Sequence, residues 1–336
     1  MSARLRQIHR IEDLGPEGCL ELATLATRLR RHPEPRALEG KVLALLFLSP
    51  SLRTQASFQA AMTRLGGGSF VIAPDRFIHK LEFDPDRVMD GAAAENVAEA
   101  LPVLAAYGDA IGVRAFAGLE NLAEDLADRR FEAIRRFCGA PFLNMESAIR
   151  HPCQSLGDWL TLDDLEIPAR GGRFVLSWAQ HTKALPLAVA SDTLRMAAMR
   201  GMEVTVLRPE AFELPEPIMS QARALARASG GSVRETSDRA EAMKGAHVLY
   251  AKSWASTRCY GDHAATAELR RGLTGWTVAE DWFAGARPDC RFLHCLPVRR
   301  GVVVEGAVLD GPRSEVVQQA ENRMWAQMAA LHRMLA

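Results

Sequence analysis

The sequence lacks the runs and charge bias that mark membrane and nucleic-acid-binding proteins. No window approaches the roughly 18 consecutive apolar residues of a membrane span, and the start, MSARLRQIHRIEDLGPEG, has no apolar signal core. Lysine plus arginine and aspartate plus glutamate number 41 each, so no net charge draws the chain to nucleic acid or an anionic membrane. We therefore expect a cytoplasmic protein that binds neither, with any anion recognition confined to a local site.

Several catalytic motifs are also missing. There is no GxGxxG or Walker loop, no serine nucleophile elbow and no pair of carboxylates with an obvious geometry. The six cysteines are scattered, which predicts free thiols rather than a disulfide frame. Cys290 and Cys295 flank His294 but lack a second ligand pair at zinc-finger spacing. Covalent, metal-assisted and glycosidase mechanisms therefore have little support, and we expect no metal site.

What the sequence does contain is a repeated alternation of short apolar runs and helical patterns. This alternation is typical of parallel strands joined by crossover helices, and 336 residues suffice for two domains. The predicted strands cover 42–48, 70–73, 110–113, 141–145, 174–178, 203–207, 247–251 and 290–296. We predict an α/β protein with two domains, each a parallel sheet flanked by helices. The predicted bounds are 1–150, 151–315 and a C-terminal helix over 316–336 that returns to the first domain.

The first strand ends in a stretch that predicts an anion site. Ser49 to Thr54, SPSLRT, leads into an amphipathic helix over 53–65, whose apolar residues repeat at i, i+3, i+4 and i+7. Free backbone N–H groups and the helix dipole favour an anion there, and Arg53 adds a forked cationic donor. On its own the stretch is equally compatible with a serine cap beside a solvated arginine.

Polar residues follow the other predicted strands at the same kind of position. Ligands of open α/β sheets bind outside the carboxyl ends of strands. The residues found there are Arg114, Glu146, His151 and Gln154 in the first half, and His181, Lys252, Cys295 and Leu296 in the second, with Arg323 on the last helix. Singly each has an ordinary structural explanation, but together they favour a ligand cleft. A polyanion held by arginines beside a polarised carbonyl indicates transfer of an acyl-like group from phosphate to a nucleophile.

These residues lie in motifs whose order resembles that of the aspartate/ornithine carbamoyltransferase superfamily. The motifs are SPSLRT (49–54), GVRAF (112–116), HPCQ (151–154), HCLP (294–297) and AENR (320–323). The resemblance implies two α/β domains with the active site between them, a homotrimer with sites at subunit interfaces, and no metal or organic cofactor. It also implies that a neutral amine attacks carbamoyl phosphate and releases phosphate.

The resemblance implies a role for each motif residue. The phosphate would be bound by Ser51, the Leu52 backbone, Arg53, Thr54, Arg114 and Arg323. The carbonyl oxygen would be polarised by His151 with Thr54 and Arg114, and the carbamoyl amide held by Gln154 and the backbone near Cys295 and Leu296. His79 stands where a neighbouring subunit supplies a tryptophan in relatives.

The second substrate is indicated by other stretches. The acidic loop of ornithine enzymes and the basic loop of aspartate enzymes are both missing. Instead NMES, EFDPDRVMDG, YAKSWA and HCLPVRR resemble the branch that carbamoylates N-acetylornithine or N-succinylornithine in arginine synthesis. The acylornithine would then be contacted by Glu146, Lys252, Leu296 and His181.

Ala94 bears on the acyl group. Acetyl enzymes have a glutamate at the corresponding place and succinyl enzymes a proline. A carboxylate there would repel a succinyl carboxylate, so alanine permits succinyl binding. We favour N-succinylornithine, although alanine matches neither pattern.

Three further positions depart from the family pattern, and two alternative functions stay open. Gln55 replaces an arginine, His79 replaces the tryptophan, and Val303 replaces a lysine that is carboxylated in some relatives. The alternatives are an ordinary ornithine carbamoyltransferase and a catalytically silent member that binds small anions.

Overall fold

The structure is a computed structural model that describes residues 5–73 and 80–336. It divides into two compact units. Unit 1 comprises Met1–Ala117, Glu124–Gly157 and Arg323–Ala336, and unit 2 comprises Gly118–Ala123 and Asp158–Asn322. Each unit contains a parallel sheet with helices, and the last helix ends in unit 1, which confirms the predicted fold class.

Unit 1 is built on a five-stranded sheet in the order β1-β7-β6-β2-β3, with every neighbouring pair parallel. Strand β2 lies between β6 and β3, has the sequence VLALLF and is buried over nearly its whole length, as expected of a strand covered on both faces. The strands are β1 (Gln7–Ile8), β2 (Val42–Phe47), β3 (Gly68–Ile72), β6 (Ala110–Arg114) and β7 (Phe142–Glu146).

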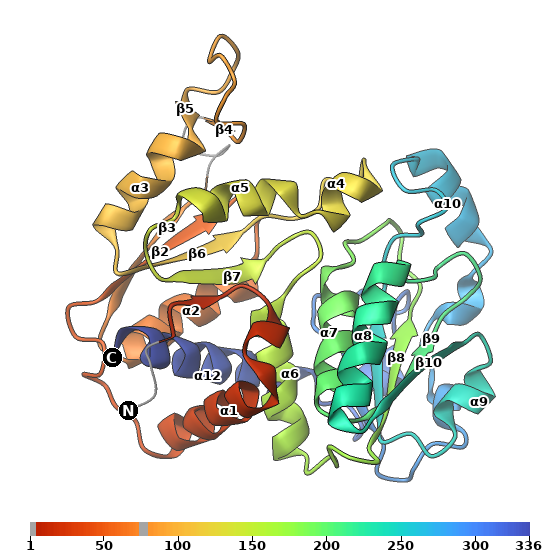
Figure 1. The fold of residues 1–336 in the computed structure, drawn as a ribbon. Coiled ribbons are helices and arrows are strands. Elements are labelled where there is room, and N and C mark those ends of the chain that lie inside the picture. The colour runs from red at the N-terminus through yellow and green to blue at the C-terminus, as the bar shows by residue number, and fades with distance from the viewer. Residues whose placement is uncertain (1–4, 74–79) are drawn as a thin grey trace. The chain divides into compact units, whose positions relative to one another are not determined.

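Helices cover both faces of this sheet. Helices α3 and α5 lie on one face, and α1, α2 and α12 lie on the other (Figure 1). Val97 of α3 and Phe131 of α5 pack with Ala44 and Leu46 of β2 in one apolar cluster. The helices are α1 (Gly15–Arg31), α2 (Leu52–Arg64), α3 (Val97–Tyr107), α4 (Leu122–Leu126), α5 (Arg129–Phe137), α6 (Pro152–Asp164) and α12 (Val316–Leu335).

Unit 2 repeats this plan with the strand order β10-β9-β8-β11-β12, again all parallel. Helices α7 and α8 lie on one face (Figure 1), and Met243 of α9 packs with Val175, Leu249 and Phe292 on the other. The elements are β8 (Arg173–Trp178), α7 (Ala188–Met199), β9 (Glu203–Leu207), α8 (Glu216–Ser229), β10 (Ser232–Thr236), α9 (Arg239–Met243), β11 (Val248–Lys252), α10 (His263–Arg271), β12 (Arg291–Leu293) and α11 (Gly306–Asp310).

In both sheets the order in which strands are added changes sides at the first long strand, β2 or β8. In unit 1 the chain moves from β2 outward to β3 and then returns to place β6 on the other side of β2. In unit 2 it moves from β8 to β9 and β10 and returns to place β11 beside β8. Such a switch point opens a crevice at the carboxyl ends of the two neighbouring strands, which is where ligands of these sheets bind.

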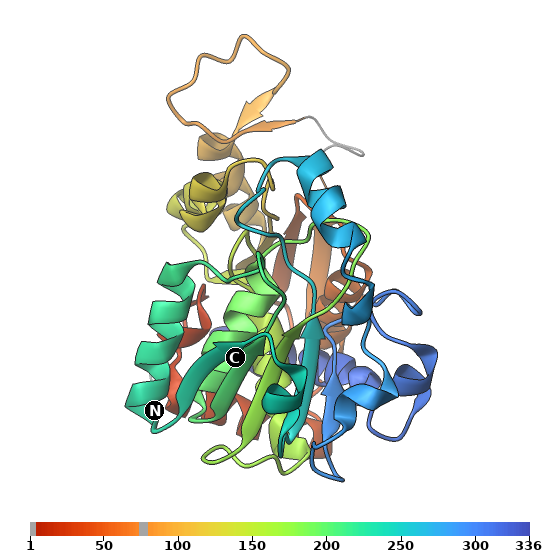
Figure 2. The same ribbon diagram turned by 90° about the vertical axis from the view of Figure 1, so that its right-hand side faces the viewer.

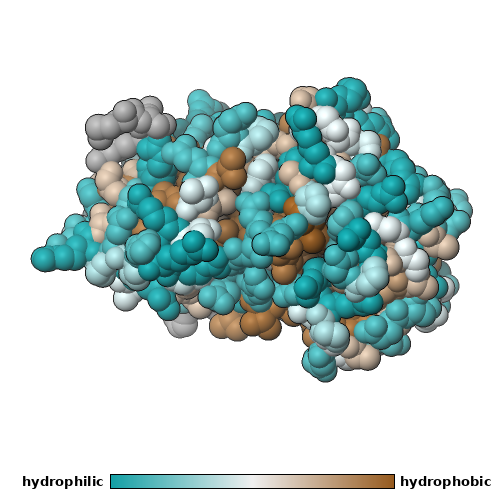
Figure 3. Space-filling model, turned by 90° about the horizontal axis from the view of Figure 1, so that it is seen from below, coloured by the Kyte–Doolittle hydropathy of each residue, from teal (hydrophilic) through white to brown (hydrophobic). Residues whose placement is uncertain are grey.

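One segment projects from unit 1. Strands β4 (Leu81–Glu82) and β5 (Glu95–Asn96) pair in parallel, and the loop joining them extends beyond α3 (Figures 1 and 2). Val88 and Met89 in this loop are exposed, as is Leu52 at the start of α2. The molecular face in Figure 3 is mostly hydrophilic, with separate apolar areas rather than one continuous apolar surface.

Candidate functional site

The switch point of unit 1 holds the predicted anion-binding stretch. SPSLRT follows β2, and Arg114 is the last residue of the adjacent strand β6. Ser49 Oγ accepts a hydrogen bond of 3.1 Å from the Phe116 N–H, so the segments leaving β2 and β6 are tied together. Sheet topology therefore brings Arg114 to the same edge as the start of α2.

Ser51 caps helix α2. Its φ of −157° is extended, and its Oγ accepts from the Thr54 N–H at 3.3 Å and donates to Thr54 Oγ1 at 2.9 Å. The first turn contains no acidic side chain to offset the positive end of the helix dipole. The serine cap considered in the sequence analysis is thus present. The first turn of α2 also carries the positive charge of Arg53 with no acidic side chain in that turn.

Arg323 reaches the same place from helix α12. Its side chain is buried, with Nη2 donating to Thr54 Oγ1 at 3.1 Å and Nη1 to Gln154 Oε1 at 3.4 Å. Burial, and then the positive charges of Arg114 and Arg53, lower the pKa of Arg323 to about 10. Guanidinium groups from two other elements, Arg114 of β6 and Arg53 of α2, therefore lie close enough to Arg323 to disfavour its positive charge.

Glu146 supplies a carboxylate within this cluster. It ends β7, and its Oε2 pairs with Arg114 Nη1 and lies 3.2 Å from His151 Nε2. All three side chains are buried. The Arg114 guanidinium also lies 4.2 Å from the centre of the Phe116 ring. Three guanidiniums against this carboxylate leave a local excess of positive charge, which favours a small polyanion such as a phosphate.

His151 and Gln154 stand at the start of helix α6. Pro152 begins the helix, and the Gln154 N–H donates to the His151 carbonyl oxygen at 3.0 Å. The structure therefore places both in the first turn, as their spacing predicts. Unit 1 brings together the predicted residues Ser51, Arg53, Thr54, Arg114, Glu146, His151, Gln154 and Arg323 through the contacts above.

The switch point of unit 2 holds His181, after β8, and Lys252, the last residue of β11. His181 Nδ1 accepts from the Lys183 N–H at 3.2 Å. Burial, together with the positive charges of Lys252, Arg299 and Arg270, lowers the pKa of His181 to about 4, and its contact with the Lys183 backbone opposes this only in part. His181 is therefore neutral at physiological pH in a cationic environment, and sequence reasoning had not singled out Arg270 or Arg299.

Cys295 and Leu296 lie in the loop that follows β12. Cys295 is buried, and Leu296 adopts a φ of 52°, a left-handed conformation that is costly for a residue with a branched side chain. The Leu296 N–H donates to His294 Nδ1 at 2.9 Å, which holds this turn. The backbone at Leu296 is therefore fixed in a conformation that few residues adopt.

The remaining predicted residues lie apart from these clusters. Ala94 is exposed at the base of the projecting segment, where its N–H donates to the Lys80 carbonyl at 3.1 Å. The exposed Gln55 donates to Gln59 on the next turn of α2 at 3.4 Å. Val303 packs in the apolar core of unit 2, so this position carries no charge. His79 lies outside the described residues.

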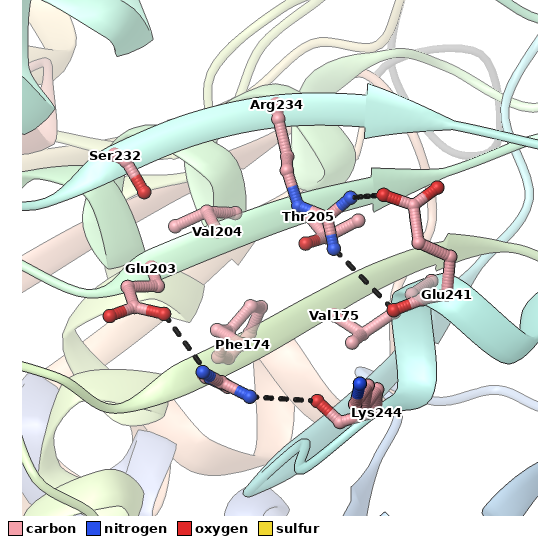
Figure 4. Close-up of a pocket in the computed structure, with 11 residues that line it drawn as sticks. Phe174, Val175, Glu203, Val204, Thr205, Ser232, Arg234, Glu241 and Lys244 are labelled. Atoms are coloured by element: carbon pink, nitrogen blue, oxygen red, sulfur yellow. Dashed lines mark hydrogen bonds and ion pairs between the residues drawn. The ribbon is translucent and has the colours of Figure 1, made fainter. Parts of the chain in front are cut away.

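A cavity of about 240 Å³ in unit 2 lies at the opposite strand ends (Figure 4). Arg173 and Glu203, the first residues of β8 and β9, face each other across it at 3.2 Å, and Arg234 pairs with Glu241. These charged side chains are thus paired with one another. We assign it no part in the reaction.

Within residues 5–73 and 80–336, no three histidine, cysteine, aspartate or glutamate side chains group as metal ligands would. None of the helices in these ranges is both long and apolar enough to cross a membrane.

The chain is similar to known carbamoyltransferases over most of its length. Residues 6–164 match the family model of the aspartate/ornithine carbamoyltransferase carbamoyl-P binding domain, and residues 187–334 match that of the Asp/Orn binding domain. The chain is 37% identical over 313 residues to an N-acetylornithine carbamoyltransferase of Xanthomonas campestris, covering 92% of each chain. It is 33% identical over 296 residues to an N-succinylornithine carbamoyltransferase of Bacteroides fragilis, covering 88% of each.

A solved structure is similar over almost the whole chain. It is a variant of N-acetyl-L-ornithine transcarbamylase in which proline replaces a glutamate, complexed with carbamyl phosphate and N-succinyl-L-norvaline. It superimposes with a TM-score of 0.94 at 35% identity and covers 99% of this chain and 100% of its own.

Proposed function

We propose that this chain, which belongs to the aspartate/ornithine carbamoyltransferase family, transfers the carbamoyl group of carbamoyl phosphate to the side-chain amine of an N-acylated ornithine. The products are an N-acylcitrulline and phosphate, and the reaction serves arginine biosynthesis. The observation that carries the proposal is the convergence in unit 1 of Arg53, Arg114 and Arg323 with Thr54, His151 and Gln154.

The arginine cluster accounts for binding of the phosphate group. Ser51, the Leu52 backbone, Arg53, Thr54, Arg114 and Arg323 bind the phosphate oxygens. Burial lowers the pKa of Arg323 most, and the positive charges of Arg114 and Arg53 add to this; a bound dianion offsets those charges. The cluster is therefore poised to stabilise the growing negative charge of the leaving phosphate.

The carbamoyl group needs a different set of contacts. Donors from Thr54, Arg114 and His151 polarise its carbonyl oxygen, which makes the carbon more susceptible to attack by the neutral amine. Gln154 and the backbone carbonyls near Cys295 and Leu296 accept from its amide. Arg114 and His151 both contact Glu146, so this carboxylate orients two of the groups that polarise the carbonyl oxygen.

The acylornithine is bound by Lys252, His181, Leu296 and Glu146. Lys252, Arg299 and Arg270 each lie close enough to His181 for their positive charges to add to burial in lowering its pKa. Several cations in one place suit a substrate with more than one carboxylate. N-succinylornithine has two, whereas N-acetylornithine has one, so this observation supports the succinyl substrate.

Ala94 also supports the succinyl substrate. It carries no carboxylate that would repel the succinyl group. The related N-acetyl-L-ornithine transcarbamylase has been solved with N-succinyl-L-norvaline in variants whose glutamate is replaced by proline or alanine. Since Ala94 lies in the projecting segment, we infer that it acts, like His79, on the site of a neighbouring copy in a homotrimer. The exposed Leu52, Val88 and Met89 are then available for subunit contacts.

The test is a side-by-side assay of N-succinylornithine, N-acetylornithine and free ornithine at fixed carbamoyl phosphate. We expect kcat/KM to be highest with N-succinylornithine and lowest with free ornithine. Higher activity with free ornithine would identify an ordinary ornithine enzyme. If labelled carbamoyl phosphate is not consumed with any of the amines, the catalytically silent alternative is correct. We also expect the protein in the cytoplasm, with no nucleic-acid partner, which fractionation and binding assays can check.

A further inference from the structure

The loop after β12 is held by a chain of buried polar side chains in unit 2. Phe292 is bonded along the outer edge of β12 by backbone groups: its N–H donates to the Arg313 carbonyl at 2.7 Å, and its carbonyl accepts from the Glu315 N–H at 3.0 Å. The His294 N–H, two residues further on, lies beyond this backbone pairing. It donates instead to Gln319 Oε1 of helix α12 at 2.9 Å.

Asp158 fixes the orientation of the Gln319 amide. Gln319 Nε2 donates to Asp158 Oδ1 at 2.6 Å, and both side chains are buried. If the amide were flipped, Oε1 would face the carboxylate and Nε2 would face the His294 N–H, so both contacts would become repulsive. Because Asp158 Oδ1 accepts from Gln319 Nε2, Gln319 presents its oxygen, an acceptor, to His294.

The effect of this network reaches the predicted substrate-binding backbone. His294 Nδ1 accepts from the Leu296 N–H at 2.9 Å, and Leu296 keeps its left-handed φ of 52°. An uncommon backbone conformation persists only where its surroundings over-determine it. The path of bonds from Asp158 through Gln319 and His294 to Leu296 provides that constraint.

We propose that Asp158 and Gln319 are positioning residues for the carbamoyl group: they set the backbone at Cys295 and Leu296 without touching substrate. This inference rests on the proposed function, which assigns that backbone to the carbamoyl amide. The network belongs to unit 2, whereas the phosphate-binding cluster belongs to unit 1. Disturbing the network lowers kcat and leaves the affinity for phosphate unchanged.

The experiment compares Gln319→Met, Asp158→Asn and the control Thr161→Val. Methionine keeps the length of Gln319 but removes both hydrogen bonds. Asparagine at 158 offers a donor as well as an acceptor, so it no longer enforces one amide orientation. Thr161 lies one turn beyond Asp158 and accepts at 3.1 Å from Asn322 on the same helix as Gln319, so its valine variant tests the loss of an ordinary bond between α6 and α12.

Two readouts separate this inference from the proposed function. Amide hydrogen exchange of a peptide spanning 291–298 requires no activity, and we expect faster exchange in Gln319→Met, an intermediate change in Asp158→Asn and none in Thr161→Val. In the assay with N-acylornithine we expect kcat to fall about 10- to 100-fold in Gln319→Met, with a smaller fall in Asp158→Asn. The dissociation constant for inorganic phosphate should stay within about 2-fold. A displaced backbone at Leu296 misplaces the carbamoyl group, which lowers kcat, but it leaves the phosphate contacts intact.

Unchanged exchange in Gln319→Met overturns the inference, as does faster exchange with an unchanged kcat. An equal loss in Thr161→Val would show that general helix packing is responsible. If Gln319→Met does not fold, Asp158→Asn decides the matter by the same readouts. If the wild-type protein consumes no carbamoyl phosphate, the proposed function fails, and with it the role assigned to this network in catalysis, while exchange still reports whether the loop is held.

Discussion

At the scale of the residue, function and stability are in conflict around Arg53. Burial makes the charge on Arg323 costly, and the positive charges of Arg114 and Arg53 add to that cost. A fold optimised for stability alone would separate these charges, whereas a phosphate site needs them together. We therefore expect substitutions in the cluster to affect ligand binding far more than folding.

Arg53→Ala is the direct test. Loss of a charge-assisted contact to phosphate costs about 1.5–3 kcal/mol, which corresponds to roughly 10- to 150-fold weaker binding of carbamoyl phosphate. The free energy of unfolding without ligand should change little, because one source of repulsion is removed. Isothermal titration and denaturant unfolding measure the two effects. Arg36→Ala, which removes an exposed arginine paired with Glu39, should change neither. Binding of carbamoyl phosphate as tight as in the parent would refute the anion site.

Glu146→Gln should separate the two substrates. The variant removes the carboxylate that pairs with Arg114 and His151. Arg114 then has no internal competitor for phosphate, so carbamoyl phosphate should bind as tightly as before or more tightly. The KM for N-acylornithine should rise, because the amine substrate loses its carboxylate partner. A KM increase confined to carbamoyl phosphate would contradict the assignment of Glu146.

Asp128 provides a residue-scale prediction about pH. Burial raises the pKa of Asp128 to about 6, although the hydrogen bonds that its carboxyl group accepts from Ser147 and Ala148 lower the pKa in part. Because the folded state holds this proton more tightly than the unfolded state, stability falls as pH rises from about 4 to about 6. Asp128→Asn should therefore raise the free energy of unfolding at pH 7.5, by up to about 3 kcal/mol, and have little effect at pH 4. Urea unfolding at the two pH values measures this, and an equal gain at both would contradict it.

At the scale of the element, the crossing of α6 and α12 depends on one glycine. A Cβ on Gly157 would lie 2.8 Å from Arg323 Cα and 3.1 Å from its backbone nitrogen, where real Cβ atoms are almost never found. The close approach lets Arg323 extend to Gln154 and Thr54.

Gly157→Ala should therefore displace α12 at Arg323. We expect a loss of about 1–3 kcal/mol in stability from overpacking, together with weaker binding of carbamoyl phosphate. Thermal unfolding and titration with carbamoyl phosphate measure the two. The control is Gly139→Ala, since a Cβ there meets nothing within 4 Å. Full retention of carbamoyl phosphate affinity in a folded Gly157→Ala would show that the crossing does not position Arg323.

The elements also show how far sequence reasoning reached. Buried apolar runs such as VLALLF predict their strands, and the positions at the ends of these strands predict Arg53, Arg114 and Lys252 as site residues. Strand β10, with the sequence SVRET, was missed because it is an edge strand with no fully buried residue and only one apolar side chain. The Gln319–Asp158 bond was also missed, because it joins residues 161 positions apart in a pattern typical of ordinary packing helices. The order of strands in the sheets and hydrogen bonds between distant side chains can be known only from the folded structure, whereas the ends of buried strands can be predicted from the sequence.

At the scale of the whole molecule, the question is whether the projecting segment completes the active site of a neighbouring copy or acts within its own chain. The loop between β4 and β5 extends outward from unit 1, and its Val88 and Met89 are exposed. Large exposed apolar side chains on a protruding loop are typical of a contact surface. The homotrimer with shared sites proposed above would give this loop a partner, and light scattering measures the mass of the assembly.

Mixed assemblies test the sharing itself. One inactive chain carries Arg53→Ala, and the other has 84–91 replaced by a short glycine-serine linker, which leaves its own arginine cluster intact. In a cyclic assembly of equal numbers of both chains, about one quarter of the sites combine an intact cluster with an intact neighbouring loop. Coexpression should therefore restore about a quarter of the wild-type kcat per site, although each chain alone is inactive. If each site were contained in one chain, the mixture would stay as inactive as its components, and Ala94 would have to act on the acyl group from within its own chain.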